Sequence, residues 1–483
     1  FREDMTGCLE HYDVIVIGSG PGGYVSAIRC SQLGLKTLCI ERCGDSDKPI
    51  LGGTCLNVGC IPSKALLDSS YKFFQAEKEL KFHGILMEKL SVDVIEMQKR
   101  KEKIVLALTK GVQGLFKLNH VDSIQGEALV EGVGKVSVMK PDNSKVDLTA
   151  DYIIIATGSR PIELPSISFD QKSVLTSTEA LNLQKVPERL AVIGAGAIGL
   201  EIGSIWSRLG SEVEILETLK DFLPSADKQI SSEALKILTK QGITIKLAVN
   251  VQSAEITNDE VTVKYVDESG EQELIVDKLI VAVGRTPAIQ NVLGQNSGVE
   301  IDDKGFIKVN SSCESRKVNI YAIGDTVYGP MLAHKATEEG MMVAENIAGE
   351  SIEIDYERIP AVIYTHPEIA WVGLSEEQAN DNGLEIKTGF FPFSANGRAL
   401  ASSEGIGFVK VIADAKDDSI QGIHVIGPAA ADIIQQGVIA MNLESTAEDL
   451  SLTMFSHPTF SEAFHEAALF IRGKAIQISN RKR

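Results

Sequence analysis

Two stretches of the chain show the same order of hydrophobic and polar positions. In the first, the apolar run Val14–Ile17 leads into a glycine-rich turn over Gly18–Gly23. A helical pattern over Tyr24–Leu33 and a β-branched run over Lys36–Ile40 follow, and the run ends at Glu41. Because short apolar runs bounded by glycines are typical of buried strands, this stretch predicts a strand, a glycine turn, a helix, a second strand and an acid.

The second stretch repeats this order far downstream. The apolar run Leu190–Ile193 leads into Gly194–Gly199, a helix extends to Leu209, and the strand Val213–Leu216 ends at Glu217. In both copies the first glycine and the acid are 23 positions apart (41 − 18 and 217 − 194). One glycine triplet is weak evidence, but two copies in complete strand–helix–strand context predict two dinucleotide-binding folds. The copies start 176 positions apart (194 − 18), too far for the two halves of one fold.

The rest of the chain predicts connections and a third domain. Residues Val92–Leu118 predict a helix that faces the core, with Lys99–Lys101 on its solvated face. The apolar positions that carry this helix prediction are Val94, Met97, Ile104, Val105, Leu108, Val112 and Leu115. Two strand–glycine segments, Tyr152–Gly158 and Leu279–Gly284, echo each other and return the chain from one domain to the next. From about Ile359 the strands alternate in polarity without a glycine fingerprint, which predicts an α+β domain.

Composition narrows the class of protein. The 483 residues are 44% hydrophobic and 23% charged, an ordinary balance for a globular chain of about three domains. The net charge of −19 disfavours general binding to nucleic acids or to anionic membranes. The longest apolar candidate, Leu190–Leu200, is glycine-rich and stops at Glu201, well short of the ~18 residues that a membrane helix needs.

The start of the chain and its cysteines bear on the compartment. Phe1–Asp4 lacks a cationic start followed by an apolar stretch, so we expect no secretory signal, and Met5 is the candidate natural start. Seven cysteines are too few for a disulfide scaffold, and this favours a reducing compartment. We interpret five of them as buried or incidental: Cys8, Cys30, Cys39, Cys43 and Cys313.

Each glycine turn is suited to hold a diphosphate. The glycines permit a tight turn, close approach of the backbone to the phosphates, and close helix–strand packing. The phosphates then lie at a helix N-terminus, where unpaired N–H groups and the helix dipole favour negative charge. Glu41 and Glu217 can accept hydrogen bonds from ribose hydroxyls. Since a carboxylate repels a 2′-phosphate, the second site is expected to prefer NAD over NADP, while a purely structural turn remains the alternative.

A third signal is the segment Gly52–Lys64, which carries two cysteines between glycines. Cys55 and Cys60 are five positions apart (60 − 55). On an ideal helix five residues turn about 140° beyond one full circle and rise ~7.5 Å. A disulfide needs Cα atoms within about 7 Å, so a bond between these cysteines would require a distorted turn, and a strained disulfide near a cofactor is of the redox-active kind. Zinc is disfavoured because no second cluster of ligands lies nearby in sequence, and two buried thiols remain the alternative.

These segments together resemble the flavin-dependent pyridine nucleotide–disulfide oxidoreductases, and most closely the members that oxidise dihydrolipoamide. The resemblance covers nearly the whole chain. Besides the cysteine segment and both fingerprints, it is carried by Ala156–Arg160, Val283–Pro287, Tyr321–Asp325, Met331–Ala336 and His457–Glu462. It implies an α/β fold of two Rossmann-like dinucleotide-binding domains and a C-terminal α+β dimerisation domain. The implied division is 1–157 and 285–355 for the two parts of the FAD-binding and central domain, 158–284 for the NAD-binding domain, and 356–483 for the dimerisation domain.

The resemblance also assigns roles to single residues. It implies that FAD and NAD are held by Gly18, Gly20, Gly23, Glu41, Lys64, Asp325, Gly194, Gly196, Gly199, Glu201, Glu217 and Gly284. Asp325 would bind the ribityl chain of the flavin, and Lys64 would lie near the flavin ring and pair with Glu201. Glu201 lies inside an apolar helical stretch, where an unpaired carboxylate would be costly, although an exposed carboxylate is the alternative.

The catalytic residues follow from the same resemblance. Cys60 would be the sulfur next to the flavin, and Cys55 the sulfur that the substrate attacks. A dithiol substrate needs a base because the thiolate is the nucleophile. His457 with Glu462 resembles the His–Glu pair of the family, in which the carboxylate orients the imidazole. His366 and His465 are interpreted as structural.

The implied reaction is the oxidation of protein-bound dihydrolipoamide with reduction of NAD⁺ to NADH. The implied partners are the lipoyl domains of 2-oxo acid dehydrogenase complexes and a second copy of the chain. The expected location is the cytoplasm, or the mitochondrial matrix for a eukaryotic chain whose transit peptide has been removed.

Other activities are disfavoured by particular residues. A glutathione-type reductase usually lacks the third glycine at Gly199 and carries arginines for NADPH. A mercuric or thioredoxin reductase needs a further cysteine pair near the C-terminus, whereas the last cysteine here is Cys313. A flavin NADH oxidase or peroxidase uses one redox cysteine. A non-catalytic flavin-binding subunit would not need Cys55, Cys60 and His457 together. An NAD(P)H-dependent disulfide reductase with another substrate is the remaining alternative.

Overall fold

The computed structural model describes residues 9–45 and 48–480. The expectations about Phe1–Asp4, Met5 and Cys8 lie outside these residues. The chain forms two compact units, each built from three separate segments. The first unit comprises Phe1–Ala65, Ile95–Ile162 and Gly284–Ile354, and the second comprises Leu66–Val94, Glu163–Val283 and Asp355–Arg483.

The first unit is built on a seven-stranded sheet in the order β5-β2-β1-β8-β7-β6, with β19 also pairing with β8. Strands β5, β2, β1, β8 and β19 pair in parallel, and β6 and β7 complete the sheet as antiparallel strands. The strands are β1 (Glu10–Ile17), β2 (Thr37–Glu41), β5 (Asp122–Gln125), β6 (Glu127–Gly132), β7 (Lys135–Met139), β8 (Lys145–Ile155) and β19 (Ile320–Ala322). Short pairs are formed by β3 (Gly44–Asp45) with β4 (Lys48–Pro49) and by β9 (Ser159–Pro161) with β18 (Arg285–Pro287).

The central strand β1 shows why its sequence is an unbroken apolar run. Val14 and Val16 pack into one hydrophobic cluster, and Ile15 and Ile17 pack into another. Since successive side chains of a strand point to opposite faces, a strand that is covered on both sides needs apolar residues at every position. The first predicted strand, its helix and its partner strand are confirmed as β1, α1 and β2.

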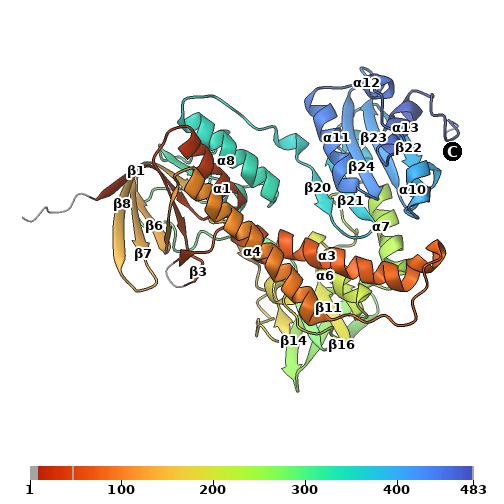
Figure 1. Ribbon diagram of the computed structural model, residues 1–483, viewed down its shortest axis with the longest axis horizontal. Coiled ribbons are helices and arrows are strands. Elements are labelled where there is room, and N and C mark those ends of the chain that lie inside the picture. The colour runs from red at the N-terminus through yellow and green to blue at the C-terminus, as the bar shows by residue number, and fades with distance from the viewer. Residues whose placement is uncertain (1–8, 46–47, 481–483) are drawn as a thin grey trace, which may run out of the picture. The chain divides into compact units, whose positions relative to one another are not determined.

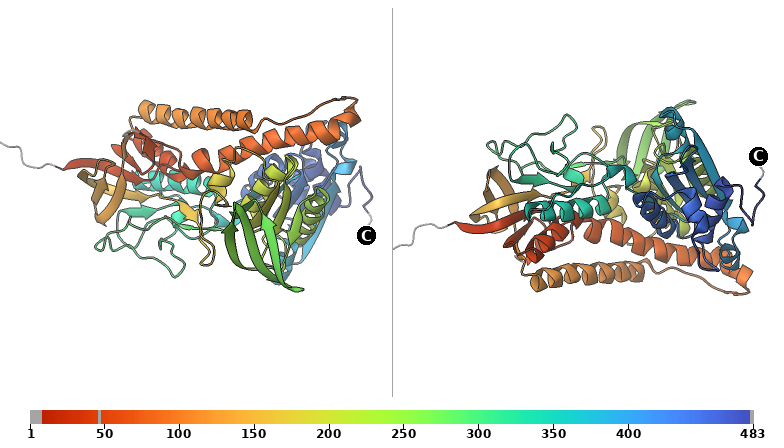
Figure 2. Two further views of the ribbon diagram at one scale, coloured as in Figure 1. Left: turned by 90° about the horizontal axis from the view of Figure 1, so that it is seen from below. Right: turned by 90° about the horizontal axis from the view of Figure 1, so that it is seen from above.

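The helices of the first unit are α1 (Pro21–Gln32), α2 (Gly53–Val58), the start of α3 (Cys60–Phe74), α4 (Val94–Leu118, of which Val94 belongs to the second unit), α8 (Ala333–Ile347) and the short η3 (Gly324–Thr326). Helices α1 and α8 lie side by side (Figure 1). The further views show α4 as one long continuous helix (Figure 2).

The helix predicted over Val92–Leu118 is confirmed as α4, but its buried face is partly wrong. Lys101, predicted on the solvated face, is buried, and burial lowers the pKa of its ammonium group. Leu108 and Leu115, predicted to face the core, are exposed. The buried face of α4 therefore includes polar side chains that the apolar pattern did not assign to it. Its buried residues are Val94, Met97, Gln98, Lys101, Thr109, Val112 and Phe116.

The second unit contains a parallel sheet in the order β10-β17-β11-β12-β13. The strands are β10 (Val174–Leu175), β11 (Arg189–Ile193), β12 (Glu212–Leu216), β13 (Thr244–Lys246) and β17 (Lys278–Val281). Its helices are α5 (Ser177–Ala180), α6 (Ala197–Arg208) and α7 (Lys228–Lys240). An antiparallel sheet of β14 (Asn250–Thr257), β15 (Glu260–Asp267) and β16 (Gly270–Val276) packs on it through a shared core. The second predicted strand–helix–strand copy is therefore confirmed as β11, α6 and β12.

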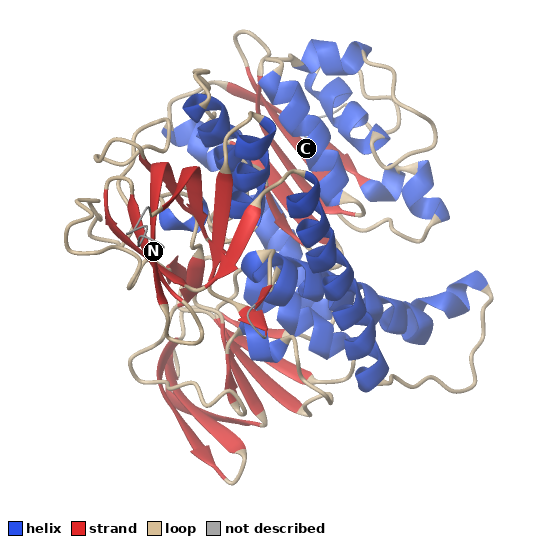
Figure 3. Cartoon of the chain, turned by 60° about the vertical axis from the view of Figure 1, so that its left-hand side comes forward, coloured by secondary structure: helices blue, strands red, loops and turns tan. Residues whose placement is uncertain are grey.

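The C-terminal part of this unit is a five-stranded antiparallel sheet in the order β20-β21-β24-β23-β22. Its strands are β20 (Ala361–Ile363), β21 (Glu368–Gly373), β22 (Ile386–Pro392), β23 (Phe408–Asp414) and β24 (Ile420–Gly427). The helices are α9 (Glu376–Asp381), α10 (Gly397–Ala401), α11 (Ala430–Asn442), α12 (Ala447–Leu452) and α13 (Glu462–Ile471), and α11 and α13 pack on the sheet. Figure 3 shows the helices of the chain in blue and its strands in red. Short helical turns complete the unit: η1 (Gln75–Glu79), η2 (Leu80–His83), η4 (Tyr356–Arg358) and η5 (Phe393–Ala395). This arrangement agrees with the predicted α+β domain.

Among the helices formed by residues 9–45 and 48–480, none combines the length and the apolar character that a membrane-spanning segment requires.

Candidate functional site

The first glycine turn has three glycines with three different local demands. Gly18 has a φ of +100°, and a Cβ there would lie 2.4 Å from the carbonyl oxygen of Ala156. Gly23 packs so closely that a Cβ would lie 1.9 Å from the Gly18 oxygen. At Gly20, by contrast, a Cβ would meet no described atom within 4 Å. The outer two glycines thus fold the turn, and the middle one leaves open space against the backbone.

The second glycine turn has the same three features at its corresponding glycines. Gly194 has a φ of +105°, and a Cβ there would lie 2.5 Å from the Ala282 oxygen. A Cβ at Gly199 would lie 2.0 Å from the Gly194 oxygen, whereas a Cβ at Gly196 would meet none of the described atoms within 4 Å. Two turns that are far apart in sequence therefore have the same local structure. We call each of them a cradle, the first at Gly18–Gly23 and the second at Gly194–Gly199.

Both cradles open onto the N-terminus of a helix. Gly20 is the N-cap of α1 and Gly196 is the N-cap of α6, and neither helix has a side-chain cap among the described residues or an acid in its first turn. The first N–H groups of each helix are therefore available to an anion. The open backbone and the helix terminus together fit the diphosphate of a dinucleotide at both places.

The acids at the ends of the second strands lie at these cradles. Glu41 is buried, and its Oε2 accepts from the backbone N–H and the hydroxyl of Ser19 at 2.9 and 2.6 Å. In the second copy, Glu217 Oε2 accepts from the Ala195 N–H at 2.7 Å. Each carboxylate therefore lies directly beside its glycine turn, where the ribose of a bound dinucleotide would need an acceptor.

The two cysteines meet at a break between helices. Cys55 lies on α2 and Cys60 begins α3, while Gly59 between them leaves the helical conformation with φ −134° and ψ −108°. The expected distortion is thus present. The Cys55 and Cys60 side chains form a hydrogen bond with each other.

The environment of Cys55 favours the protonated thiol over the thiolate. The hydrogen bond with Cys60 and burial raise the pKa of the Cys55 thiol well above its usual range, and the nearby Lys64 ammonium acts in the opposite direction. Because only the thiolate is a good nucleophile, thiol chemistry at this pair needs a base.

A chain of polar contacts fixes Asp325. The Ser159 hydroxyl donates to Asp325 Oδ2 at 2.5 Å, and Arg285 donates from Nε to the Ser159 hydroxyl at 2.7 Å and from an Nη atom to the Ser159 carbonyl at 2.7 Å. Burial lowers the pKa of Arg285, while Asp325 and Cys60 favour its charge. Gly284, beside Arg285, has a φ of +121° and accepts from the Ile162 N–H at 3.1 Å.

Sequence reasoning missed Arg285 and Ser159 as individual site residues. A signal was present, because each follows one of the two strand–glycine segments that echo each other. The short strands β9 and β18 that contain them pair with each other.

His457 and Glu462 form the expected pair in the second unit. His457 Nδ1 lies 2.8 Å from Glu462 Oε1, and the other carboxylate oxygen accepts from the Thr459 N–H at 2.8 Å. Burial would raise the pKa of Glu462, but the hydrogen bonds from His457 and Thr459 lower it overall, so the carboxylate is ionised at neutral pH. The His457 side chain is 75% exposed. The imidazole is therefore oriented through Nδ1 and presents its other nitrogen to solvent.

Glu201 is buried on α6, and its Oε1 accepts from the Tyr364 N–H at 3.1 Å. The exposed alternative is therefore wrong. Lys64 belongs to the first unit and Glu201 to the second, so their pairing stays a prediction.

The other two histidines have protein partners. His366 Nε2 lies 2.7 Å from the Tyr71 hydroxyl and 3.1 Å from Glu404 Oε2, and its ring stacks on Tyr71. His465 Nε2 lies 3.2 Å from the Ser451 carbonyl oxygen. Both sets of contacts are consistent with structural roles.

The remaining described cysteines divide into two groups. Cys30, Cys39 and Cys313 are buried, and Cys43 is exposed. Burial raises the pKa of Cys30 to about 12, so this thiol stays protonated.

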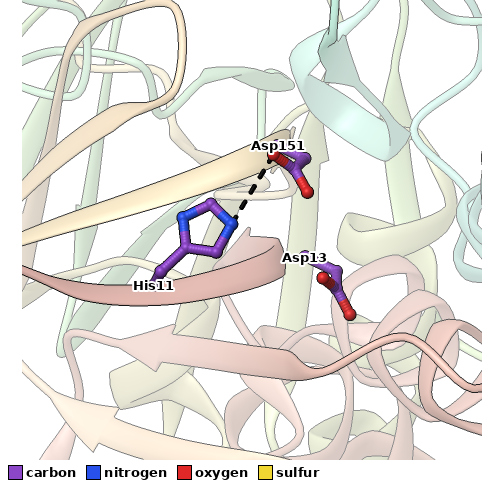
Figure 4. A group of neighbouring side chains, drawn as sticks. All are labelled: His11, Asp13 and Asp151. Carbon is purple, nitrogen blue, oxygen red and sulfur yellow. Dashed lines mark ion pairs between the residues drawn. The ribbon is translucent and has the colours of Figure 1, made fainter.

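One cluster on the first sheet has metal-ligand chemistry. His11 and Asp13 on β1 lie near Asp151 on β8, with His11 Nε2 3.6 Å from Asp151 Oδ1 (Figure 4). His11 and Asp151 are more than half exposed, and Asp13 already accepts from the Lys36 N–H at 2.6 Å. Because these side chains are mostly exposed and Asp13 is already hydrogen-bonded, we do not assign a metal ion to this cluster.

Comparison with known proteins bears on this arrangement. Residues 12–340 match the family "Pyridine nucleotide-disulphide oxidoreductase", and residues 359–468 match the dimerisation domain of the same family. A "Dihydrolipoyl dehydrogenase" of Cupriavidus necator is 48% identical over 478 residues, covering 97% of this chain and 100% of the relative. A "Dihydrolipoyl dehydrogenase 1, mitochondrial" of Arabidopsis thaliana is 44% identical over 468 residues, covering 96% and 91%. The structure of the "HOCl-induced flavoprotein disulfide reductase RclA" of Escherichia coli superposes with a TM-score of 0.84 at 26% identity, covering 95% of this chain and 99% of that chain.

The chain therefore belongs to the pyridine nucleotide–disulphide oxidoreductase family. It is a flavoprotein oxidoreductase that uses FAD and NAD(H), and it carries the dimerisation domain of that family. The resemblance, the fold class and the cofactors predicted from the sequence are confirmed. The roles of individual residues and the division into domains stay predictions.

Proposed function

We propose that the chain is a dihydrolipoyl dehydrogenase, which oxidises protein-bound dihydrolipoamide to lipoamide and reduces NAD⁺ to NADH. The observation that carries the proposal is the Cys55–Cys60 pair, in hydrogen-bond contact at a helix break within the unit that holds the first dinucleotide cradle. The near full-length relatives called dihydrolipoyl dehydrogenase support the choice of substrate.

In the proposed cycle the oxidised Cys55–Cys60 disulfide accepts two electrons from the substrate. One substrate thiolate attacks Cys55 Sγ, so that a mixed disulfide forms and the Cys60 thiolate leaves. His457 takes the proton of the second substrate thiol, whose sulfur then attacks the first and releases Cys55. The substrate leaves as a disulfide, Cys55 takes the proton back from His457, and Cys60 remains a thiolate, so the enzyme holds the two-electron-reduced cysteine pair. When FAD is bound, it supplies a two-electron acceptor for the dithiol and a hydride donor for NAD⁺.

The remaining residues bind and orient. Gly18, Gly20, Gly23 and Glu41 would hold FAD at the first cradle, and Gly194, Gly196, Gly199, Glu217 and Gly284 would hold NAD at the second. Asp325 would bind the flavin ribityl chain. Lys64, whose charge already acts on Cys55, would lie beside the flavin and pair with Glu201. Glu462 would fix the tautomer and orientation of His457.

We propose that the active unit is a homodimer in which His457 serves the disulfide of the partner subunit. The 75% exposed imidazole on the dimerisation domain supports this proposal. A heterodimer of Cys55→Ser and His457→Gln chains would have one site with both lesions and one site with neither. Such heterodimers should regain about half of wild-type activity, and isolated, FAD-loaded heterodimers without activity would refute the shared site.

The further proposed partners are the lipoyl domains of 2-oxo acid dehydrogenase complexes. The proposed compartment is the cytoplasm, or the mitochondrial matrix for a eukaryotic chain. The proposed domain boundaries are those given by the resemblance: 1–157, 158–284, 285–355 and 356–483.

The deciding experiment is turnover of the FAD-loaded enzyme with dihydrolipoamide and NAD⁺, followed at 340 nm. We expect NADH to form when dihydrolipoamide and NAD⁺ are supplied. We expect no comparable rate of NADPH oxidation when glutathione disulfide is the substrate. Absence of dihydrolipoamide turnover in a fully flavinylated dimer would reject the proposed substrate.

The second candidate is an NAD(P)H-dependent reductase of another disulfide. The structural likeness to a flavoprotein disulfide reductase at 26% identity favours it specifically. A reductase of this kind would turn over NAD(P)H with a panel of disulfides and would leave dihydrolipoamide unchanged.

A further inference from the structure

A buried ion pair on α8 holds the backbone of the turn that precedes Asp325. Lys335 and Glu339 lie one helical turn apart, and both side chains are 0% exposed, with Nζ and Oε1 3.0 Å apart. Lys335 Nζ also donates to the Gly324 carbonyl at 3.0 Å. The Gly324 N–H in turn donates to Glu339 Oε2 at 2.6 Å. The pair therefore holds both main-chain polar groups of Gly324, the residue directly before Asp325.

Stability alone does not account for two charges at this place. Removing a carboxylate and an ammonium group from water is costly, and a well-packed apolar pair of similar volume often stabilises a fold as well or better. The backbone that they hold is unusual, however. Gly324 has a φ of +68°, and a Cβ there would lie 3.0 Å from the Ala336 Cβ, so the turn lies directly against α8. The charged pair thus contacts the chain where a special conformation has to be maintained.

The same helix also contacts the first dinucleotide cradle. A Cβ at Gly340 would lie 2.6 Å from the carbonyl oxygen of Gly22, and a Cβ at Gly22 would lie 2.9 Å from the oxygen of Ala336. Because Gly22 is in the first turn of α1, the two helices cross at van der Waals contact beside the proposed diphosphate site. Helix α8 therefore touches both parts of the first unit that the flavin would contact, the α1 cradle and the Asp325 turn.

We propose that Lys335 and Glu339 are positioning residues for the flavin. Through Gly324 they set where Asp325 lies relative to the N-terminus of α1, so that one FAD molecule can be held at both ends. This inference rests on the proposed role of Asp325 in FAD binding. The pair acts through the turn and has no part in the thiol chemistry.

The test replaces both charges together. Lys335→Met/Glu339→Leu removes the contacts with Gly324 and leaves side chains of similar volume, so it avoids a single unpaired buried charge. We expect the dissociation constant for FAD, measured by titrating the apoprotein, to rise about tenfold or more. We also expect the visible circular dichroism of the bound flavin to change, whereas NAD⁺ affinity at the second cradle stays at the wild-type value.

Two further variants serve as controls. Glu339→Gln keeps an acceptor for the Gly324 N–H, and it should lose less FAD affinity than the double variant. Glu338→Gln makes the same change of charge at an exposed position of α8, and it should bind FAD as the wild type does.

Several outcomes overturn the inference. The inference is overturned if the double variant folds and shows wild-type FAD affinity and a wild-type flavin spectrum. If the double variant does not fold, the inference is overturned if Glu339→Gln binds FAD with wild-type affinity. Asp325→Asn separates the two levels of the argument. If Asp325→Asn loses FAD affinity while the Lys335 and Glu339 variants do not, only the positioning role of the ion pair fails. If Asp325→Asn binds FAD normally, the role of Asp325 fails and the inference with it. Turnover of the wild type with dihydrolipoamide tests the proposed function independently.

Discussion

Replacing Lys410 by methionine should strongly destabilise the second unit. The Lys410 side chain on β23 is 2% exposed, and its Nζ lies 2.8 Å from Asp227 Oδ2 and 2.6 Å from Glu376 Oε2. Asp227, which is 0% exposed, also caps α7 by accepting from the Gln229 N–H at 3.0 Å. Methionine fills most of the volume but leaves the Asp227 carboxylate buried without its cation.

The size of the effect follows from that burial. Removing one partner of a buried ion pair costs about 3–5 kcal/mol, because the other charge stays desolvated. For a domain of 150–250 residues, about 1 kcal/mol lowers the unfolding midpoint by roughly 2–4 °C. We therefore expect a drop of roughly 6–20 °C. Since a chain of several domains does not unfold in two states, midpoints and not extrapolated free energies are compared.

The assay is thermal unfolding of the FAD-loaded protein, followed by far-ultraviolet circular dichroism. Lys387→Met is the matched control, because Lys387 on the neighbouring β22 is 44% exposed and lies 3.8 Å from its carboxylate partner. An exposed pair of this kind contributes about 0–1 kcal/mol. A midpoint for Lys410→Met within about 2 °C of the control variant would refute the reasoning.

The pH dependence gives a second check on the same variant. Burial would raise the pKa of Asp227, but the hydrogen bond and charge of Lys410 lower it overall. A carboxyl with a depressed pKa stabilises the fold above its unfolded value of about 3.9, and this contribution is lost as the pH falls through the folded value. In Lys410→Met the Asp227 carboxyl has lost its cation, so we expect it to bind a proton more readily. Lowering the pH should therefore relieve part of the destabilisation of the variant. The midpoint difference between variant and wild type should therefore shrink from pH 7 toward pH 4. His424, opposite Lys410 on β24, is buried, and burial lowers the pKa of its imidazole, which disfavours the charged form.

The remaining predictions concern the proposed chemistry. Cys55→Ser and Cys60→Ser should each abolish dihydrolipoamide oxidation and leave FAD bound, since one sulfur cannot form the disulfide; substantial turnover by either variant, in an assay of kcat, would show that the pair is not redox-active. Glu217→Ala should narrow the preference for NAD⁺ over NADP⁺, because a carboxylate and a 2′-phosphate repel each other; equal kcat/KM of the wild type with both cofactors would contradict this assignment. Glu462→Gln should lower kcat/KM for dihydrolipoamide by about 10²-fold or more through loss of the oriented base, with FAD content as the control; a wild-type rate would exclude a role for the pair with His457.

The two dinucleotide folds could be predicted because their constraints are local. A positive φ at Gly18 and at Gly194, and the close contacts at Gly23 and Gly199, exclude any other residue and so appear directly in the sequence. The spacing to the acids adds a second local signal. The cysteine segment is equally local, because the break at Gly59 that brings Cys55 and Cys60 together lies between them.

The buried charges could not be predicted in the same way. A lysine inside a helical pattern is normally exposed, so the sequence predicts that Lys101 lies in solvent, and only the packed structure shows that its side chain is buried. Lys410 and Asp227 are 183 positions apart, and no pattern in either neighbourhood indicates the other. Lys335 and Glu339 do have the spacing of a helical ion pair, but that spacing usually marks an exposed face.

The turn at Gly324 shows why both kinds of constraint are needed. A glycine permits a φ of +68° but does not select it, and the freedom that it adds to the unfolded chain makes any single conformation more costly to hold. At Gly18 the neighbouring strand β2 contributes to the selection, because the Gly18 N–H donates to the Ile40 carbonyl at 2.8 Å. At Gly324 the selection comes from Lys335 and Glu339, which bind its carbonyl and its N–H. Sequence motifs thus locate the turns that could hold a cofactor, while the buried charges that fix those turns emerge only from the fold.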